Sequence, residues 1–265
     1  MKIIGEKING TIDLVKNAVQ KKDDDFIQKL AMSQDKAGAS WLDVNAGTLP
    51  DKEPQDLAWL VKVVQEVSDL PLCLDSANKD ALAYAIKKVD KTPMINSISC
   101  EPERLDETLP IVCHHNCDVI ALAMDETGIP KDAKARLEVI DKLITTTRKA
   151  GLLDDKVYID PLVTALATGT DSGKIAFETM EKAHKKFPEI HFTMGLSNIS
   201  FGLPKRSVVN RIFMALSMAS GLDTAIMDPL DKELMEAVVT AELVLGKDDY
   251  CANYTRAYRE SKTNL

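Results

Sequence analysis

Asp and Asn residues recur at the ends of short apolar segments of this chain. The positions are Asn9, Asp43 with Asn45, Asp75, Asn96, Asp125, Asp160, Asn198 and Asp228. A carboxylate accepts two parallel hydrogen bonds from an amino group and an adjacent ring N–H, whereas an amide both donates and accepts. One such residue alone is more often a helix N-cap or a turn residue. Eight segment ends with such residues together predict a polar pocket for a flat, largely uncharged ligand that presents N–H donors and a carbonyl, such as an aminopyrimidinone ring.

The apolar segments have the length and composition of β-strands. They span residues 3–8, 41–44, 70–74, 93–98, 119–124, 156–159, 190–196 and 222–227. Several are apolar throughout, which is typical of strands buried on both faces. We therefore expect eight strands, each of which ends in one of the polar positions.

Helical periodicity appears in the intervals between these strands. Apolar residues recur at helical spacing at Leu82, Ile86 and Val89, at Leu137, Ile140 and Ile144, and at Val209, Ile212, Phe213 and Leu216. Strict alternation of strand and helix indicates a parallel sheet with right-handed crossovers. Eight such units predict an α/β fold, a TIM (β/α)₈ barrel that forms a single domain over residues 1–265. An open doubly wound sheet is the alternative, although no G-x-G-x-x-G follows the first strand.

Composition excludes several classes of partner. The chain carries 33 Lys and Arg against 41 Asp and Glu, a net charge of −8. This balance, without a basic cluster, argues against binding to nucleic acid or to an anionic membrane surface. No run approaches 18 consecutive apolar residues, so no membrane span is expected. Five cysteines fit reduced thiols better than a disulfide framework, which predicts a cytoplasmic protein.

The residues at the strand ends also limit the chemistry. No histidine lies at a strand end, which disfavours a His-rich catalytic zinc site. Lys7 is the lysine nearest to one, and we expect it to point outward or to pair with a carboxylate, so a Schiff-base mechanism is disfavoured. A magnesium site built from several carboxylates stays open as an alternative. We expect that this chain binds no metal.

The segment from Cys113 to Cys117 reads Cys-His-His-Asn-Cys and resembles a metal cluster in composition. We place it in a helix of the outer layer, away from the strand ends. Cys113 and Cys117 are four residues apart and would both belong to the inward stripe of that helix. Core packing is therefore the favoured interpretation of this segment.

Seven stretches of the chain match those of a known family. They are IIGEKING at the start, LDVNAG at 42–47, LCLDS at 72–76, MINSIS at 94–99, TGIPKD at 127–132, YIDPL at 158–162 and GLSNISFGLP at 195–204. On these residues the chain resembles the pterin-binding methyltransferases that move a methyl group between tetrahydrofolate and a corrinoid. It is also similar to dihydropteroate synthases, but it lacks the basic Lys-x-Arg segment that they use for the pyrophosphate side.

The resemblance implies roles for individual residues. The pterin's amino-pyrimidinone edge would be held by Asp75, Asn96 and Asp160. Residues close to the ring would be Gly195, Ser197 and Asn198, of which Asn198 would be the catalytic residue that reaches N5, the nitrogen that carries the methyl group. Additional pterin-binding candidates are Asp43, Arg206 and either Ile226 or Met227. Phe201 stands where a Gln is usual in the branch that acts on an iron–sulfur corrinoid protein, so its role and the preferred direction of transfer stay open.

The activity implied by the resemblance is methyl transfer between a methylcorrinoid and N5 of tetrahydrofolate, in the direction that forms 5-methyltetrahydrofolate. The reverse direction and a dihydropteroate-synthase-like reaction are the alternatives; a folate-storage module and a magnesium lyase are rivals from other classes. The cobalamin would be carried by a separate corrinoid protein, for which residues 48–55, 127–132 and 163–172 are candidate docking loops. The resemblance also implies a homodimer.

Overall fold

The computed structural model describes residues 1–263 and contains a parallel eight-stranded barrel. The strands are β1 (Lys2–Asn9), β2 (Trp41–Asn45), β3 (Leu72–Asp75), β4 (Met94–Ser99), β5 (Asp118–Leu122), β6 (Val157–Asp160), β7 (His191–Phe192) and β8 (Thr224–Met227). Their order in the sheet is β7-β6-β5-β4-β3-β2-β1-β8, with every pairing parallel. The predicted TIM barrel is confirmed, and the open doubly wound sheet is wrong.

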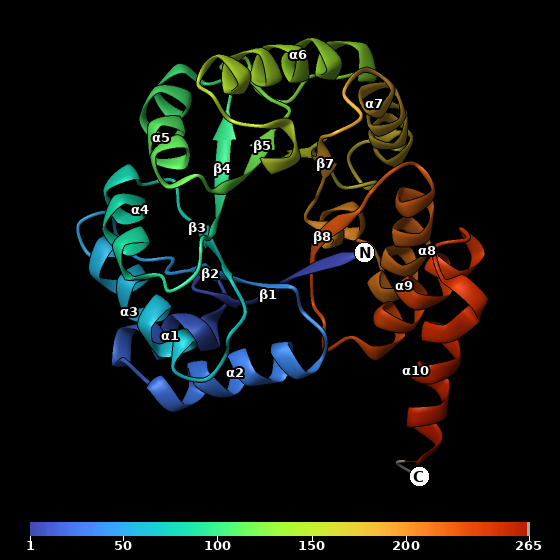
Figure 1. Cartoon of the computed structure of the whole chain (residues 1–265), viewed down its shortest axis with the longest axis horizontal. Coiled ribbons are helices and arrows are strands. Elements are labelled where there is room, and N and C mark those ends of the chain that lie inside the picture. The colour runs from blue at the N-terminus through green and yellow to red at the C-terminus, as the bar shows by residue number, and fades with distance from the viewer. Residues whose placement is uncertain (264–265) are drawn as a thin grey trace.

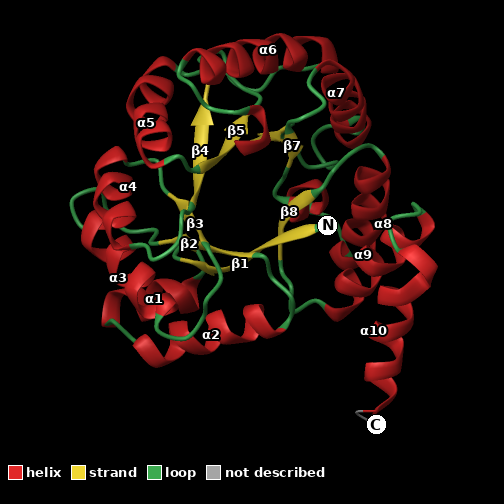
Figure 2. Ribbon diagram, in the orientation of Figure 1, coloured by secondary structure: helices red, strands yellow, loops and turns green. Residues whose placement is uncertain are grey.

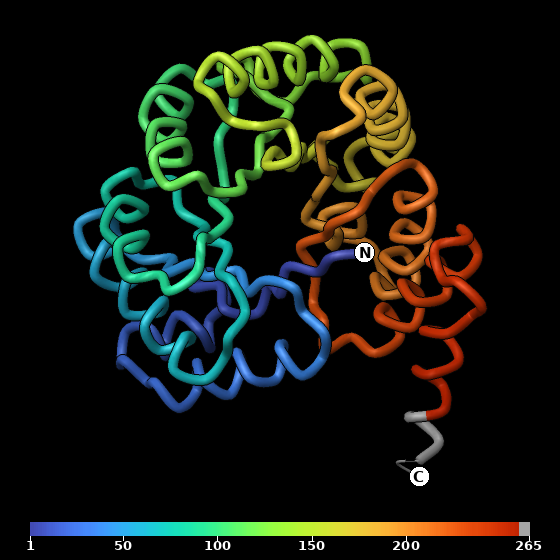
Figure 3. The backbone as a smooth tube through the Cα atoms, in the orientation of Figure 1, coloured from blue at the N-terminus to red at the C-terminus, as the bar shows by residue number. Residues whose placement is uncertain are grey.

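Helices surround the strands in a ring (Figure 1). The helices are α1 (Asp13–Lys21), α2 (Asp24–Lys36), α3 (Glu53–Gln65), α4 (Lys79–Ala85), α5 (Pro102–His115), α6 (Ala133–Lys149), α7 (Ser172–Lys186), α8 (Arg206–Ala219), α9 (Lys232–Val244) and α10 (Ala252–Thr263). Short 3₁₀ turns lie at Ile86–Lys88, Asp154–Lys156, Leu196–Ser200 and Asp249–Cys251. Figure 2 shows the strands inside and the helices outside, and Figure 3 shows α10 leading away from the ring. No helix within residues 1–263 has both the length and the apolar character needed to cross a bilayer.

The seventh strand is shorter than its apolar run predicts. Regular strand structure covers His191–Phe192 alone, although Thr193 N–H still donates to the Ile159 carbonyl at 2.9 Å. The barrel is closed between β7 and β8 by Ile226 N–H, which donates to the Met194 carbonyl at 3.0 Å. The chain then turns directly into the 3₁₀ segment Leu196–Ser200, denoted η3 below.

Apolar side chains fill the barrel in a layer of their own. Each of six consecutive strands contributes one buried residue to this layer, namely Ile4, Trp41, Cys73, Met94, Ile120 and Tyr158. A second, larger core lies between the sheet and the helices. Since side chains alternate along a strand, the residue two positions after each member of the interior layer also faces the barrel axis. Those residues form the next layer toward the carboxyl ends of the strands.

Three helical predictions need correction. Helix α4 ends at Ala85, and Val89 already has extended backbone, so the expected helical stripe breaks up after its first turn. Ile212 and Leu216 of α8 are 62% and 49% exposed, because Phe213, Met214 and Met218 form the inward face instead. Cys117 lies outside α5, which ends at His115.

Candidate active site

The layer above the apolar interior is largely polar. Its members follow the apolar layer by two residues on β1, β2, β3, β4, β5 and β6, and they are Glu6, Asp43, Asp75, Asn96, Leu122 and Asp160. Asp43 and Asp160 are buried, whereas Glu6, Asp75, Asn96 and Leu122 are half-buried. Parallel strands of a barrel present this end to the loops that follow them, which is where TIM-barrel active sites are built. The structure therefore brings Asp75, Asn96, Asp160 and Asp43 of the predicted set to one mouth.

Asp43 is the most deeply placed carboxyl of this layer, with 2% of the residue exposed. Burial, followed by the nearby charge of Asp75, raises the pKa of Asp43 well above its ordinary value, while side-chain hydrogen bonds with Cys73 and Asn96 act against that rise. Its Oδ1 atom is buried and has no hydrogen-bond partner within the described residues. An unpartnered buried carboxyl oxygen is costly, so this atom is available to a donor brought by a ligand.

Asp75 faces Asn96 across the β3–β4 pairing. The Asn45 side-chain amide donates to Asp75 Oδ2 at 2.9 Å. Burial raises the pKa of the Asp75 carboxyl, and the Asn45 hydrogen bond and the charge of Arg104 oppose this shift. Two close carboxyl groups with raised pKa values favour a state in which they share a proton or meet cationic or N–H donors.

Asp160 ends β6, where its carboxyl is almost completely shielded from solvent. Burial raises the pKa of Asp160 to about 7, against hydrogen bonds from the backbone of Leu162 and Gly195 and the charge of Arg136. Leu162 N–H donates to Asp160 Oδ1 at 2.7 Å. This carboxyl therefore changes charge near neutral pH, which is a property of many functional sites.

The predicted residues 195–198 lie on the short connection after β7. A Cβ atom added to Gly195 would come within 3.0 Å of Asn198 Nδ2, so the absence of a side chain lets the Asn198 amide fold back over this residue. Asn198 is exposed and Ser197 half-buried. The position thus offers an amide on a tight turn at the rim, above the buried carboxyls.

Arg206, a predicted pterin-binding residue, makes its hydrogen bonds to η3. Its Nη2 donates to the Ser197 carbonyl at 2.8 Å, and its Nε donates to Ser200 Oγ at 3.0 Å. The guanidinium also lies 5.8 Å from the centre of the Phe201 ring, which is 68% exposed. Arg206 therefore holds η3 in place, and its charge also lowers the pKa of Glu6 in the mouth layer.

Of the two candidates on β8, Met227 points away from the barrel axis. Its side chain is fully buried in the core between the sheet and the helices. Ile226 is half-buried and packs against the interior layer. Of the two alternatives, strand alternation therefore favours Ile226, which turns inward, over Met227, which turns outward.

Glu6 belongs to the same layer, although its position within β1 does not mark it as a strand-end residue. Burial and the charge of Asp228 raise its pKa, while Lys7 and Arg206 lower it. Lys7 itself pairs with Asp228 at 2.9 Å, as expected. The signal that finds Glu6 is its spacing of two from Ile4, not its distance from the end of β1.

Three of the eight strand-end residues are engaged in local turns. Asn9 Oδ1 accepts from Thr11, and Asp125 Oδ1 accepts from Thr127, in each case from both N–H and hydroxyl. Asp228 Oδ1 accepts from Leu230 N–H at 2.9 Å. The turn interpretation applies to these three, as it does to the Asp160–Leu162 contact, although Asp228 also pairs with Lys7 and raises the pKa of Glu6.

The Cys-His-His-Asn-Cys segment does not converge on one point. Cys117 is buried and Cys113 half-buried, while His114 and His115 are exposed. Within residues 1–263, no group of three or more His, Cys, Asp or Glu side chains is arranged to hold a metal ion.

Comparison with known proteins gives four findings. A sequence family described as "Pterin binding enzyme" matches residues 5–228. The methylcorrinoid:tetrahydrofolate methyltransferase of Eubacterium limosum is 38% identical over 264 residues, covering 99% of this chain and 97% of that protein. The methionine synthase of Mycobacterium tuberculosis is 31% identical over 237 residues, which are 84% of this chain and 20% of that protein. Among solved structures, dihydropteroate synthase from Xanthomonas albilineans in complex with 7,8-dihydropteroate aligns over 92% of this chain and 93% of its own, with a TM-score of 0.68 and 16% identity.

Proposed function

The chain belongs to the family of pterin-binding enzymes, and from this premise we propose that it transfers a methyl group between a methylcorrinoid and N5 of tetrahydrofolate. The observation that carries the proposal is the polar layer at the barrel mouth, in which buried acceptors lie beneath an exposed amide. The relative from Eubacterium limosum, whose name states this reaction, aligns with the chain over nearly its full length. We extend the proposal to residues 1–265 as one pterin-binding domain.

The pterin would bind through its amino-pyrimidinone edge. This edge presents an amino group and a ring N–H side by side, which a carboxylate accepts in parallel. Asp75 and Asp160 supply such carboxylates, and Asn96 supplies an amide able to meet the carbonyl of the ring. The Oδ1 atom of Asp43, which has no hydrogen-bond partner among residues 1–263, adds an acceptor in the same layer. A ligand rich in N–H donors would satisfy these groups, whose burial is otherwise unfavourable.

Asn198 would serve N5. In the direction that forms 5-methyltetrahydrofolate, the N5 lone pair attacks the methyl carbon, the cobalt–carbon bond breaks with its electron pair left on cobalt, and N5 then releases its proton. A neutral amide can accept from N–H and donate to a lone pair, so it suits N5 both with and without that proton. The contribution of the chain is thus positioning and electrostatics.

The corrinoid would be presented by another protein at the barrel mouth. The candidate loops remain residues 48–55, 127–132 and 163–172, which follow β2, β5 and β6 and so lie at the carboxyl ends of the strands. Asn198 is exposed at the same rim, which leaves space for a second protein to bring a methyl group to it.

A homodimer is part of the proposal, with its interface on α8 and α9. Ile212 and Leu216 of α8 and Val244 of α9, which is 79% exposed, line a groove of about 630 Å³ between these helices. Apolar surface of this kind on two adjacent helices is typical of a protein–protein contact. Sedimentation of wild type and Ile212→Glu tests this assignment, with the dimer expected for wild type alone.

The cytoplasm is the compartment that we propose. All five cysteines are free in the structure, in agreement with a reducing environment.

Two measurements test the methyl transfer. Calorimetric titration with tetrahydrofolate should show binding without added metal, and free methylcobalamin should be demethylated slowly only when tetrahydrofolate is present. Binding without any turnover, even with methyl-loaded corrinoid proteins, would favour a storage module. Loss of activity with a chelator would favour a magnesium lyase.

A further inference from the structure

Arg136 is a buried cation next to the candidate site. It lies in the first helical turns of α6, and 2% of the residue is exposed. Burial lowers its pKa, and the charge of Asp160 is the largest effect in the opposite direction. Arg nevertheless stays protonated in proteins, so a full positive charge is held beside the loops that follow β5 and β6.

The guanidinium binds the backbone that directly follows Asp160. Its Nη1 donates to the carbonyls of Pro161 and Leu162, each at 2.6 Å. Leu162 has a φ of 61°, the left-handed region that a residue with a side chain rarely adopts. This turn is therefore held from two sides, by Asp160 at the Leu162 N–H and by Arg136 at the Leu162 carbonyl.

Arg136 also reaches the preceding loop. Its Nε donates to the Pro130 carbonyl at 3.1 Å, in the connection between β5 and α6. One side chain thus ties the loop after β5 to the loop after β6. Three carbonyl acceptors in fixed directions match the planar fork of Arg, which Lys cannot reproduce.

We propose that Arg136 is a positioning residue for Asp160, holding the Asp160–Leu162 turn and supplying the positive field in which this carboxylate meets a donor-rich ring. The inference rests on the proposed function only in naming tetrahydrofolate as the ring-bearing ligand. The charge of Arg136 lowers the pKa of Asp160. Besides Asp160, the carboxylates of Asp132 and Asp171 raise the pKa of Arg136.

Titration of Asp160 in the ligand-free protein tests the electrostatic part. Carboxyl ¹³C shifts of labelled aspartate, with the Asp160 signal assigned through Asp160→Asn, should give a midpoint near 7 for wild type. Removal of the cation in Arg136→Met should raise the midpoint by about one unit, and Arg136→Lys should leave it near that of wild type. Arg148→Met is the matched control, because Arg148 lies at the other end of α6 and pairs with Asp154 on the surface. An equal midpoint in wild type and Arg136→Met would overturn the inference.

Folate affinity tests the positioning part. A bidentate acceptor must be ionised, so a midpoint raised by one unit reduces tetrahydrofolate affinity at pH 7 about fivefold in Arg136→Met, with recovery above pH 9. Arg136→Lys should weaken affinity severalfold at every pH, because the charge is kept and the fork is lost. Should Arg136→Met not fold, the lysine variant decides: wild-type affinity in that variant would overturn the inference. Failure of the wild type to bind tetrahydrofolate would instead overturn the proposed function, and the Asp160 titration would still decide the role of Arg136.

Discussion

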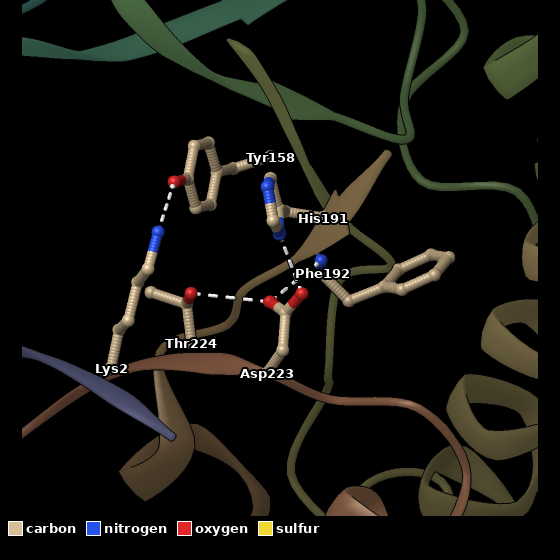
Figure 4. Close-up of polar contacts among 6 residues, drawn as sticks. All are labelled: Lys2, Tyr158, His191, Phe192, Asp223 and Thr224. Carbon is tan, nitrogen blue, oxygen red and sulfur yellow. Dashed lines mark hydrogen bonds and ion pairs between the residues drawn. The ribbon is translucent and has the colours of Figure 1, made fainter. Parts of the chain in front are cut away.

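The two ends of the barrel differ in whether their charged side chains find hydrogen-bond partners within the chain. At the amino-terminal end, Lys2 Nζ donates to the Tyr158 hydroxyl at 3.2 Å, and the Tyr158 and His191 rings stack with their centres 4.6 Å apart (Figure 4). Asp223 then accepts from His191 Nδ1 at 2.6 Å. At the carboxyl-terminal end, Asp43 and Asp160 are buried with raised pKa values, and one Asp43 oxygen has no hydrogen-bond partner in the described part of the chain.

This difference separates stability from function within one fold. Polar groups whose hydrogen bonds are all made within the chain stabilise the fold. Buried acceptors without a hydrogen-bond donor destabilise it, and a ligand that brings donors can satisfy them. In TIM barrels, residues at the amino-terminal end of the strands contribute mainly to stability, and active sites lie at the carboxyl-terminal end. Substitutions at the two ends of the barrel can test whether stability and ligand binding are separated in this way.

The largest effect is expected for loss of a mouth carboxylate. Asp160→Ala or Asp75→Ala should weaken tetrahydrofolate binding by about 2–4 kcal/mol, because donors of the ligand are then buried without acceptors. Calorimetric titration measures the change. Asp125→Ala is the matched control, since Asp125 bonds its own turn; equal losses in the control and mouth variants would abolish the distinction between turn and site residues.

Loss of the Asn198 amide at the rim should lower the rate of methyl transfer. Asn198→Ala is expected to slow demethylation of free methylcobalamin by roughly tenfold to a thousandfold, the usual worth of one well-placed donor. Folate affinity should change much less than the rate. A variant with full rate and normal affinity would show that Asn198 does not serve N5.

The buried carboxyl of Asp160 should make the free energy of unfolding depend on pH. Because burial raises the pKa of Asp160 from 3.8 to about 7, its ionisation weakens the folded state progressively as the pH rises through that interval. Asp160→Asn should therefore stabilise the ligand-free protein by about 1–3 kcal/mol at pH 8 and by little near pH 4. Urea unfolding at the two pH values measures the difference, and a gain that is equal at both would contradict this account.

The amino-terminal end should show the smallest effect and the opposite pattern. Asp223 accepts from His191, from Phe192 N–H at 3.2 Å and from the Thr224 hydroxyl at 3.1 Å. Asp223→Ala should lower the free energy of unfolding by about 1–2 kcal/mol and leave folate affinity unchanged. A weaker folate affinity at unchanged stability would assign function to this end as well.

Much of the site follows from local sequence alone. Asp43, Asp75, Asn96 and Asp160 were predicted because each lies at or near the end of an apolar run, and parallel strands bring such ends together. Asn198 came with the resemblance, and the structure adds that Gly195 makes room for its amide. These inferences depend on short stretches of chain, which is why a single sequence supports them.

Other residues could not be assigned at that level. The end of a strand does not tell which side chains face the axis, so the sequence leaves Ile226 and Met227 as alternatives and does not single out Glu6. The interior layer formed by Ile4 and its neighbours determines which residues of each strand face the axis. Likewise, the apolar spacing in α8 did not show that Ile212 and Leu216 lie outside the core.

The sequence by itself determined the alternation of strands and helices, the excess of acidic and amide residues at the strand ends, and the family. These properties depend on residues that are close in the sequence, through their periodicity and through short motifs. Only the tertiary structure decided which carboxyls are buried without partners, which are consumed by turns, and that Arg136 reaches the backbone beyond Asp160. Burial and hydrogen-bond partners arise from segments distant in the chain, and they determine whether a polar group stabilises the fold or is left for a ligand.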